Sequence, residues 1–296
     1  MLFRFFPLGL LLCVACAQPN PSTLVEVEEI IQDRFSEVEG DFAVAFQSLD
    51  NPDEQLLINA NEEFHAASTM KTPVMLEVYK QSESGEMNLD DSILVKNEFY
   101  SIVDSSTYSL SPEDDSYDAL YEQLGAEQSI RDLVYHMIIS SSNLATNIVI
   151  EEVGADQVTQ TLRDLGANDI QVRRGVEDTK AYRQDLNNTT TAHDLMRLFE
   201  AIAQHKVVSA EGSQEMIDIL LDQRFNDIIP AQLPADVKVA HKTGWITGLH
   251  HDSGIVYLPD GRSYVLVLLS KNLTDEEAGV QALADVSKIL YNYLAR

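Results

Sequence analysis

A serine and a lysine three residues apart could together provide an activated nucleophile. Ser68 and Lys71 form an S-x-x-K pattern at the predicted start of a helix over residues 69–83. Residues three apart share a helix face, so the Lys71 amine can reach the Ser68 hydroxyl, and a neighbouring amine can activate such a nucleophile. The pattern alone is weak, because roughly one copy arises by chance in a chain of this length. A serine there could equally cap the helix.

Two further short patterns carry polar groups. Ser141 and Asn143 form S-x-N between two predicted helices, where helix capping is the plain alternative. The run Lys242, Thr243 and Gly244 closes a predicted strand. Its glycine would let a ligand approach the backbone closely, although it could also be an ordinary strand end.

The order of the three patterns is more specific than any one of them. S-x-x-K, S-x-N and K-T-G in this order are the signature of penicillin-recognising serine enzymes. The chain resembles the class A β-lactamase family and related low-mass penicillin-binding proteins over about residues 23–296. The segments that also carry the resemblance are 64–67, 142–147, 186–191 and 251–256.

The resemblance implies a covalent serine mechanism. Ser68 would attack a lactam or amide carbonyl, with Lys71 as candidate base and Ser141 passing a proton toward the leaving nitrogen. The backbone N–H groups of Ser68 and Trp245 would stabilise the oxyanion. The residues implied to bind the substrate's side-chain amide and carboxylate, or to lie against it, are Asn143, Lys242, Thr243 and Gly244.

The base for deacylation is the decisive residue. In class A enzymes a glutamate on an Ω-shaped loop activates the hydrolytic water. Glu177 follows Asn143 by 34 residues, which is the family's usual separation. Asp178 is a weaker candidate. The plain alternative for Glu177 is a surface carboxylate paired with Arg173 or Arg174, which would contribute little stability.

This loop also departs from the family pattern R-x-E-x-x-L-N. Gly175 stands where the family has arginine, Ala181 stands where it has the asparagine that helps to hold the water, and the loop looks shortened. Ser142 replaces the usual aspartate of S-D-N, and Trp245 is bulky where a small residue is usual. A stretch between residues 100 and 121 looks inserted. These changes leave acylation intact and put efficient deacylation in question.

The distribution of periodic segments predicts an α+β fold. Strands are predicted at both ends of the chain (42–46, 55–58, 237–240, 253–257 and 264–269), and helices fill the middle (69–83, 128–140, 143–153, 155–165, 191–205 and 210–222). Helical patterns also occur at 23–38 and 280–293. We therefore expect a β-lactamase/transpeptidase-like fold, in which an antiparallel sheet from both termini has helices on its faces and an inserted helical lobe. The sheet lobe would comprise about 23–62 and 223–296, and the helical lobe about 63–222.

The N-terminus has the pattern of an export signal. Arg4 precedes a short apolar run that ends in small residues, which is typical of a signal peptide over residues 1–17 and too short for a membrane-spanning helix. A polar linker, 18–22, follows. Cleavage after Ala17 would give ordinary secretion, whereas a lipobox reading makes Cys16 a lipid anchor. We expect a periplasmic or envelope-anchored protein, and a mature domain without cysteine.

The composition limits the classes of molecule that the protein could bind. The formal net charge of −28 disfavours binding to nucleic acids and to anionic membrane surfaces. We expect a monomer that acts on a small β-lactam or a cell-wall peptide, without a cofactor or metal. The one candidate ligand cluster, His250-His251-Asp252, lies on a predicted strand, where neighbouring side chains point to opposite faces.

Three functions remain open on the sequence. The first is an exported serine β-lactamase that is acylated on Ser68 and deacylated by Glu177. The second is a D-Ala-D-Ala carboxypeptidase or penicillin-binding protein of the same fold, which penicillin would acylate but leave slowly. The third is a penicillin or muropeptide binder without catalysis.

Overall fold

The computed structural model describes residues 21–296. The predicted signal peptide, the proposed anchor at Cys16 and most of the predicted linker lie outside these residues. The described helices, with short 3₁₀ helices marked η, are α1 (Leu24–Ser36), η1 (Ala67–Met70), α2 (Lys71–Ser84), η2 (Pro112–Asp114), η3 (Asp118–Gln123), α3 (Ile130–Ile139), α4 (Asn143–Val153), α5 (Ala155–Asp164), α6 (Thr179–Tyr182), α7 (Ala192–Ala203), α8 (Ala210–Leu221) and α9 (Glu276–Leu294).

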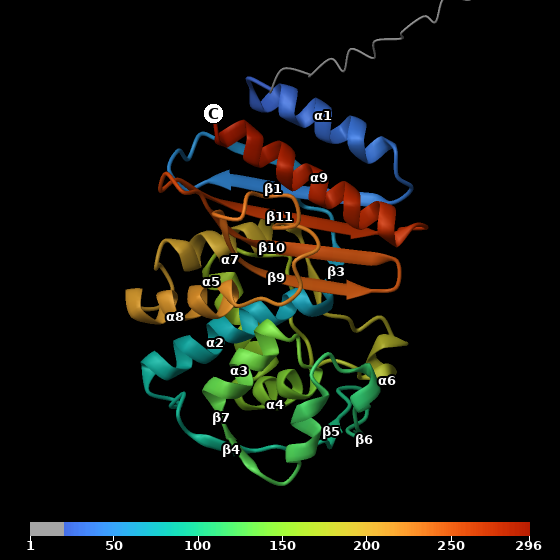
Figure 1. The fold of residues 1–296 in the computed structure, drawn as a ribbon. Helices are drawn as coiled ribbons and strands as arrows, with labels where there is room; N and C mark the ends of the chain where they lie inside the picture. The colour runs from blue at the N-terminus through green and yellow to red at the C-terminus, as the bar shows by residue number, and fades with distance from the viewer. Residues whose placement is uncertain (1–20) are drawn as a thin grey trace, which may run out of the picture.

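A five-stranded antiparallel sheet is built from both ends of the chain (Figure 1). Its strands, in the order β2-β1-β11-β10-β9, are β2 (Gln55–Ile58), β1 (Asp41–Ser48), β11 (Ser263–Lys271), β10 (Leu249–Tyr257) and β9 (Lys238–Ile246). The N-terminal strand β1 pairs with the C-terminal strand β11 along its whole length, from Asp41 opposite Lys271 to Ser48 opposite Tyr264. The predicted α+β fold with a sheet from both termini is therefore confirmed.

Short paired strands tie the remaining loops together. Three two-stranded sheets join β3 (Phe64–His65) to β8 (Thr189–Thr190), β4 (Ser92–Leu94) to β7 (Glu127–Ser129), and β5 (Phe99–Tyr100) to β6 (Thr107–Tyr108). The β3–β8 pair fastens the segment before Ser68 to the segment after Glu177. Both segments are thus held on one frame.

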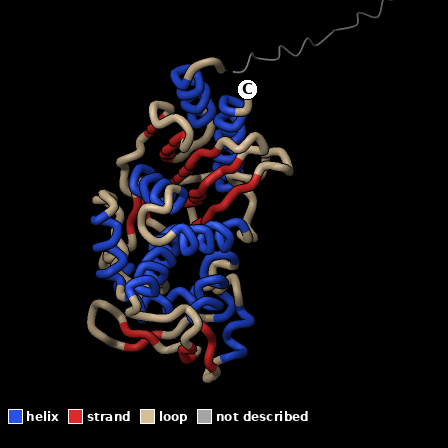
Figure 2. The backbone as a smooth tube through the Cα atoms, turned by 90° about the vertical axis from the view of Figure 1, so that its left-hand side faces the viewer, coloured by secondary structure: helices blue, strands red, loops and turns tan. Residues whose placement is uncertain are grey.

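The central strands are apolar on both faces because helices cover both. Val44, Phe46 and Leu266 belong to a core shared with α1 and α9, whereas Ala45 and Val267 face the larger core under the other helices. Figure 2 shows this layering, with helices above and below the strands. Along each strand the hydrophobic side chains alternate between the two cores, as the period of two requires.

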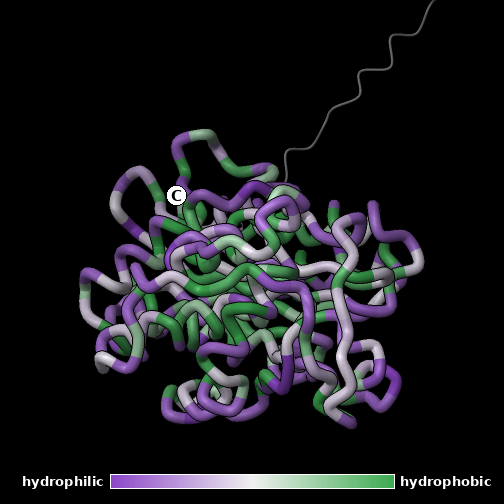
Figure 3. The backbone as a smooth tube through the Cα atoms, turned by 90° about the horizontal axis from the view of Figure 1, so that it is seen from below, coloured by the Kyte–Doolittle hydropathy of each residue, from purple (hydrophilic) through white to green (hydrophobic). Residues whose placement is uncertain are grey.

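Hydrophobic segments gather inside the molecule, while hydrophilic ones dominate its periphery (Figure 3). Within residues 21–296, no helix combines the length and apolar character needed to span a membrane. The edge strand β9 faces the helical part and passes close to η1 and α8. The candidate site lies at this junction.

Candidate active site

Ser68 lies within the 3₁₀ helix η1, one turn before α2 begins. The sequence predicted a regular helix from residue 69, but the first turn is tighter and α2 starts at Lys71. Ser68 caps neither helix, because the residue at the N-cap of η1 is Ala66. Ala67, just before it, has a left-handed backbone (φ +44°), a strained conformation for a residue with a Cβ. Ser68 is half-buried and faces a cavity of about 350 Å³.

The K-T-G run continues a strand rather than ending one. The sequence placed the end of the strand at this run, whereas β9 extends to Ile246 through its ladder with β10. Gly244 lies against the start of η1, where a Cβ would stand 2.9 Å from the Ser68 backbone nitrogen. Since real Cβ contacts avoid that distance, only glycine lets β9 pass so close to Ser68.

Lys71 and Lys242 both contact Ser141, the first residue of the S-x-N segment. Ser141 has a left-handed backbone (φ +56°) between α3 and α4. Lys71 Nζ donates to Ser141 O at 2.7 Å, to Ser141 Oγ at 3.2 Å and to Asn143 Oδ1 at 2.9 Å. Lys242 Nζ donates to the same Ser141 hydroxyl at 3.1 Å. Two amines therefore converge on one hydroxyl.

Burial lowers the pKa of both lysines. Each is completely shielded from solvent. Desolvation lowers the pKa of Lys71 to about 7, against the opposing pull of Asp115 and Glu177. Desolvation, followed by repulsion from Lys71, lowers the pKa of Lys242 well below its usual value. A lysine amine that is neutral near physiological pH can accept a hydroxyl proton. Ser141 Oγ thus lies within hydrogen-bond distance of both amines.

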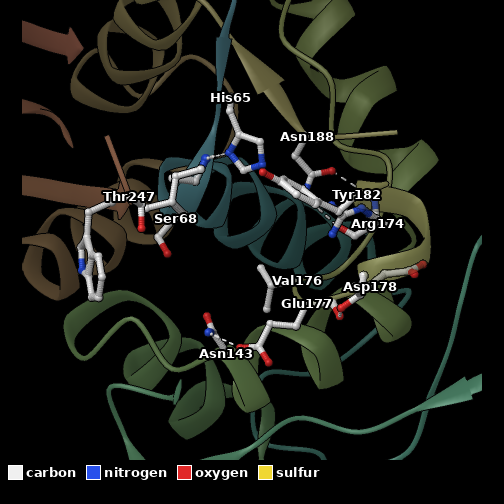
Figure 4. Close-up of a pocket in the computed structure, with 14 residues that line it drawn as sticks. His65, Ser68, Asn143, Arg174, Val176, Glu177, Asp178, Tyr182, Asn188 and Thr247 are labelled. Carbon is white, nitrogen blue, oxygen red and sulfur yellow. Dashed lines mark hydrogen bonds between the residues drawn. The ribbon is translucent and has the colours of Figure 1, made fainter. Parts of the chain in front are cut away.

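Glu177 lines the same cavity as Ser68 (Figure 4). Asn143 Nδ2 donates to Glu177 Oε1 at 2.7 Å, and within residues 21–296 the glutamate forms no ion pair with Arg173 or Arg174. Burial raises the pKa of Glu177, while the hydrogen bond from Asn143 opposes that rise. Glu177 also has a left-handed backbone (φ +63°). Strain of this kind concentrates at functional sites.

Asp178 is engaged elsewhere. It is buried and accepts hydrogen bonds from Ser101 Oγ at 2.9 Å, Ile102 N at 3.0 Å and Ala181 N at 3.1 Å. It therefore caps the short helix α6 and ties the loop to the β5–β6 hairpin. Ala181, where the sequence resemblance expects asparagine, is the fully buried residue of that helix.

Asn147 explains the glycine that departs from the family pattern. Val176 N donates to Asn147 Oδ1 at 2.6 Å, and Asn147 Nδ2 donates to Val176 O at 3.1 Å. A Cβ on Gly175 would stand 2.3 Å from Asn147 Oδ1. The absence of a side chain at residue 175 thus lets the loop reach α4 one residue before Glu177. The sequence did not predict this role, because Asn147 was only the last residue of the segment 142–147 that carries the family resemblance.

Arg174 closes the neck of the same loop. Its Nε donates to Leu186 O at 3.0 Å, Nη1 to Gly175 O at 3.0 Å and Nη2 to Asn187 Oδ1 at 3.2 Å. Asn188 completes the closure, since its Oδ1 accepts from the backbone nitrogen of Arg174 at 3.2 Å. The sequence predicted Arg174 only as a possible surface partner of Glu177, yet it is buried.

Trp245 stands at the mouth of the cavity with 59% of its surface exposed. The sequence identified it as a bulky residue at a position where a small one is usual. Thr243, two residues earlier on β9, is buried. The buried pair His241 Nδ1 and Asp252 Oδ1, 2.8 Å apart, fixes β9 to β10 next to Lys242.

The candidate ligand cluster is dispersed. Each member has its own partner: His250 Nε2 lies 3.0 Å from Glu276, His251 Nε2 lies 3.0 Å from His65 O, and Asp252 pairs with His241. Among the described residues, no three potential metal ligands come together.

Comparisons with known proteins identify the family of the chain. The model of the family described as "Beta-lactamase enzyme family" matches residues 26–294. The chain belongs to that family. It is 22% identical over 259 residues to Beta-lactamase VEB-1 of Pseudomonas aeruginosa, covering 82% of this chain and 83% of that protein. As a member of the β-lactamase family it is an enzyme of the hydrolase class.

Solved structures show the same fold. A beta-lactamase from Sphaerobacter thermophilus superposes with a TM-score of 0.77 at 26% identity, covering 90% of this chain and 95% of that one. A mutant of PBP-A, in its acyl-enzyme complex with penicillin G, gives a TM-score of 0.77 at 24% identity, covering 93% of this chain and 98% of that one. At that identity the second likeness concerns the fold alone.

Proposed function

We propose that this enzyme is a serine β-lactamase that is acylated on Ser68 and deacylated through Glu177. The observation that carries the proposal is the hydrogen bond of 2.7 Å from Asn143 to Glu177. It places a carboxylate on the wall of the cavity that Ser68 enters. Asp178, the weaker candidate for the base, is not part of the proposal, because its carboxylate accepts hydrogen bonds within the loop and from residues after β5.

Acylation joins Ser68 Oγ to the lactam carbonyl carbon and breaks the lactam C–N bond. The Ser68 proton passes to the neutral amine of Lys71. Lys71 then gives a proton to Ser141 as Ser141 gives its own to the leaving nitrogen, so the protons balance. Ser68 lies three residues before Lys71, in the turn that leads into α2, which supports Lys71 as the acceptor of its proton. The backbone amides of Ser68 and Trp245 are the proposed oxyanion donors. The close passage of β9 at Gly244 supports this assignment.

Deacylation transfers a proton from water to Glu177 while the water oxygen attacks the ester carbonyl. The bond from the carbonyl carbon to Ser68 Oγ then breaks, and the proton on Glu177 returns to Ser68 Oγ. The products are the penicilloate acid and free Ser68. A general base of this kind accelerates such a step by about 10²–10⁴-fold. Lys242 and Thr243 are proposed to bind the substrate carboxylate, and Asn143 its side-chain amide. The predicted export signal makes the periplasm or a lipid anchor at Cys16 the proposed location.

The test is hydrolysis of a chromogenic cephalosporin by the mature protein and by Ser68→Ala. We expect steady turnover by the parent and none above background by the variant. Equal turnover by both proteins would overturn the assignment of Ser68. A matched control is Ser36→Ala, which changes an exposed serine at the end of α1 and keeps the nucleophile.

The second candidate is a D-Ala-D-Ala carboxypeptidase, favoured by one observation. Ala181 offers no amide to hold a hydrolytic water, so acyl-enzymes formed from lactams could persist. The discriminating assay measures release of D-alanine from a peptidoglycan peptide. D-Alanine release combined with slow lactam turnover would favour the peptidase, and lactam turnover without D-alanine would exclude it.

A further inference from the structure

The stretch between residues 100 and 121, which the sequence predicted to be an insertion, places a carboxylate at the start of α4. Asp115 Oδ2 accepts hydrogen bonds from Leu144 N at 2.8 Å, Tyr121 Oη at 3.1 Å and Ser142 Oγ at 3.4 Å. Its other oxygen accepts from Tyr117 N at 3.0 Å. The carboxylate thus joins η2 and η3 to a helix that begins 28 residues later.

These contacts satisfy the first turn of α4. The first amides of a helix have no partner within it, and a carboxylate there also interacts favourably with the helix dipole. Ser142 Oγ accepts from Ala145 N at 3.2 Å, and Asp115 takes the amide of Leu144. Two side chains therefore share the cap, one from the S-x-N turn and one from the inserted stretch.

The sequence shows why the second side chain is required. The middle residue of this turn is Ser142, where the resembled family has aspartate. A serine brings no charge to the helix start. Asp115 supplies a carboxylate at the same place from a different part of the chain, and Ser142 Oγ donates to it. Serine and aspartate together form one capping unit.

The capped turn carries two groups of the site. Ser141 and Asn143 flank Ser142, and Ser141 is strained at φ +56°. Lys71 holds the Ser141 carbonyl, and Asn143 holds Glu177. A shift of the helix start would move both flanking residues. We propose that Asp115 is a positioning residue that fixes Ser141 and Asn143 through the first turn of α4. The inference rests on the proposed function.

Asp115 also faces the charged groups of the site. Those that surround it are Lys71 on α2, Glu177 on the loop and the neighbouring Asp114 on η2. The charge of Asp115 raises the pKa of Lys71 and that of Glu177. Its removal should therefore lower both pKa values and shift the acid limb of the pH–rate profile to lower pH. Burial raises the pKa of Tyr121, so its hydroxyl keeps its proton beside Asp115.

The test separates the hydrogen bonds that Asp115 accepts from the effect of its negative charge. Asp115→Ala removes both, Asp115→Asn keeps the shape and one acceptor oxygen, and Asp114→Asn is the matched control, because Asp114 is exposed and its side chain makes no bond to α4. The double variant Asp115→Ser with Ser142→Asp returns the carboxylate to the turn. Two readouts are measured: kcat/KM for a chromogenic cephalosporin against pH, and amide hydrogen exchange at Leu144 and Ala145.

We expect Asp115→Ala to lower kcat/KM by about tenfold or more, since hydrogen bonds to charged groups are the strong class, and to speed exchange at Leu144. Asp115→Asn should retain part of the activity with an acid limb at lower pH. Asp114→Asn should preserve kcat/KM at its optimum, and the double variant should recover most of the lost activity and protection.

Three results would overturn the inference. They are unchanged kcat/KM and exchange in Asp115→Ala, an equal loss in Asp114→Asn, and a double variant that regains Leu144 protection without activity. Failure of the proposed function looks different: the parent protein would neither hydrolyse nor be acylated by the lactam. In that case, hydrogen exchange at Leu144 would still report whether Asp115 holds the first turn of α4. Slow exchange in the parent with fast exchange in Asp115→Ala would support that contact.

Discussion

Asn143 and Glu177 are joined by a hydrogen bond of 2.7 Å between the side-chain amide and the carboxylate. The oxygen of the same amide accepts from Lys71 Nζ at 2.9 Å. One asparagine thus connects the groups proposed for the two halves of the reaction. Its amide orientation is fixed by this pairing, because only the nitrogen can donate to a carboxylate and only the oxygen can accept from an amine.

Glu177→Gln should trap the acyl-enzyme. The substitution keeps the size of the side chain and leaves an oxygen for Asn143, but it removes the base. We expect normal acylation and a fall in deacylation of about 10²–10⁴-fold, seen as a persistent mass adduct after penicillin addition. Asp178→Asn is the control and should lower the melting temperature instead, because it weakens the cap of α6. Normal turnover by Glu177→Gln would remove the glutamate from the role.

Acylation should depend on pH through Lys71. Its pKa is lowered to about 7 by burial, so the amine is neutral above that pH and becomes protonated as the pH falls. A protonated amine cannot accept the Ser68 proton, and the acylation rate should fall below about pH 7. Single-turnover acylation followed across about pH 5.5 to 8.5 measures this. A flat rate over that range would exclude neutral Lys71 as the base.

Deacylation should lose rate on the acid side for a separate reason. The pKa of Glu177 is raised above its usual value by burial, so its active, ionised form is lost at a higher pH than for a solvated glutamate. We expect the decay of an isolated acyl-enzyme to slow as the pH falls through this raised pKa. The same decay in Glu177→Gln should be slow at every pH. A parent decay rate independent of pH would contradict a glutamate base.

The sequence predicted long, periodic elements well and short, non-local ones poorly. Helix α4 begins and ends where the pattern placed it, at Asn143 and Val153, because its apolar stripe and its serine cap are local signals. The pairing of β3 with β8 was not predicted. Each of these strands has two residues, too few for a period, and their contact joins segments more than 120 residues apart.

In the site, too, the residues in local motifs were predicted and the contacts between distant segments were not. Ser68, Lys71, Ser141 and Lys242 were predicted from motifs, and the structure places the last three in direct contact. The roles of Asp115 and Asn147 depend on which loop approaches α4, and no spacing along the chain records that. Gly175 was a visible signal: a glycine in place of a side chain indicates a close approach, although its partner could not be predicted.

Gly175→Ala should strain the loop that carries Glu177. The added Cβ would meet Asn147 Oδ1 at 2.3 Å, so the loop or the amide must move. We expect a loss of about 1–3 kcal/mol in the free energy of unfolding and slower deacylation. Denaturant melts and acyl-enzyme decay measure the two effects. In an Asn147→Ala background the same glycine substitution should cost much less, and an equal cost there would show that the clash is not the cause.

Arg174→Lys should loosen the neck of the loop. A lysine cannot reproduce the three separate donors that Arg174 directs at Leu186, Gly175 and Asn187. We expect deacylation to slow by about tenfold, in line with the loss of charged hydrogen bonds, with acylation little changed. Arg173→Lys is the matched control, since Arg173 is exposed. Equal effects of the two substitutions would contradict the role of Arg174.

The most direct test of the central claim is intact-protein mass spectrometry during incubation with benzylpenicillin, with the absorbance of the lactam followed in the same mixture. The account predicts rapid loss of the lactam with only a short-lived adduct of one penicillin per protein, absent in Ser68→Ala. A stable adduct on Ser68 with little loss of lactam would contradict Glu177 as an effective base. If neither an adduct nor loss of the lactam were observed, the β-lactamase assignment itself would be contradicted.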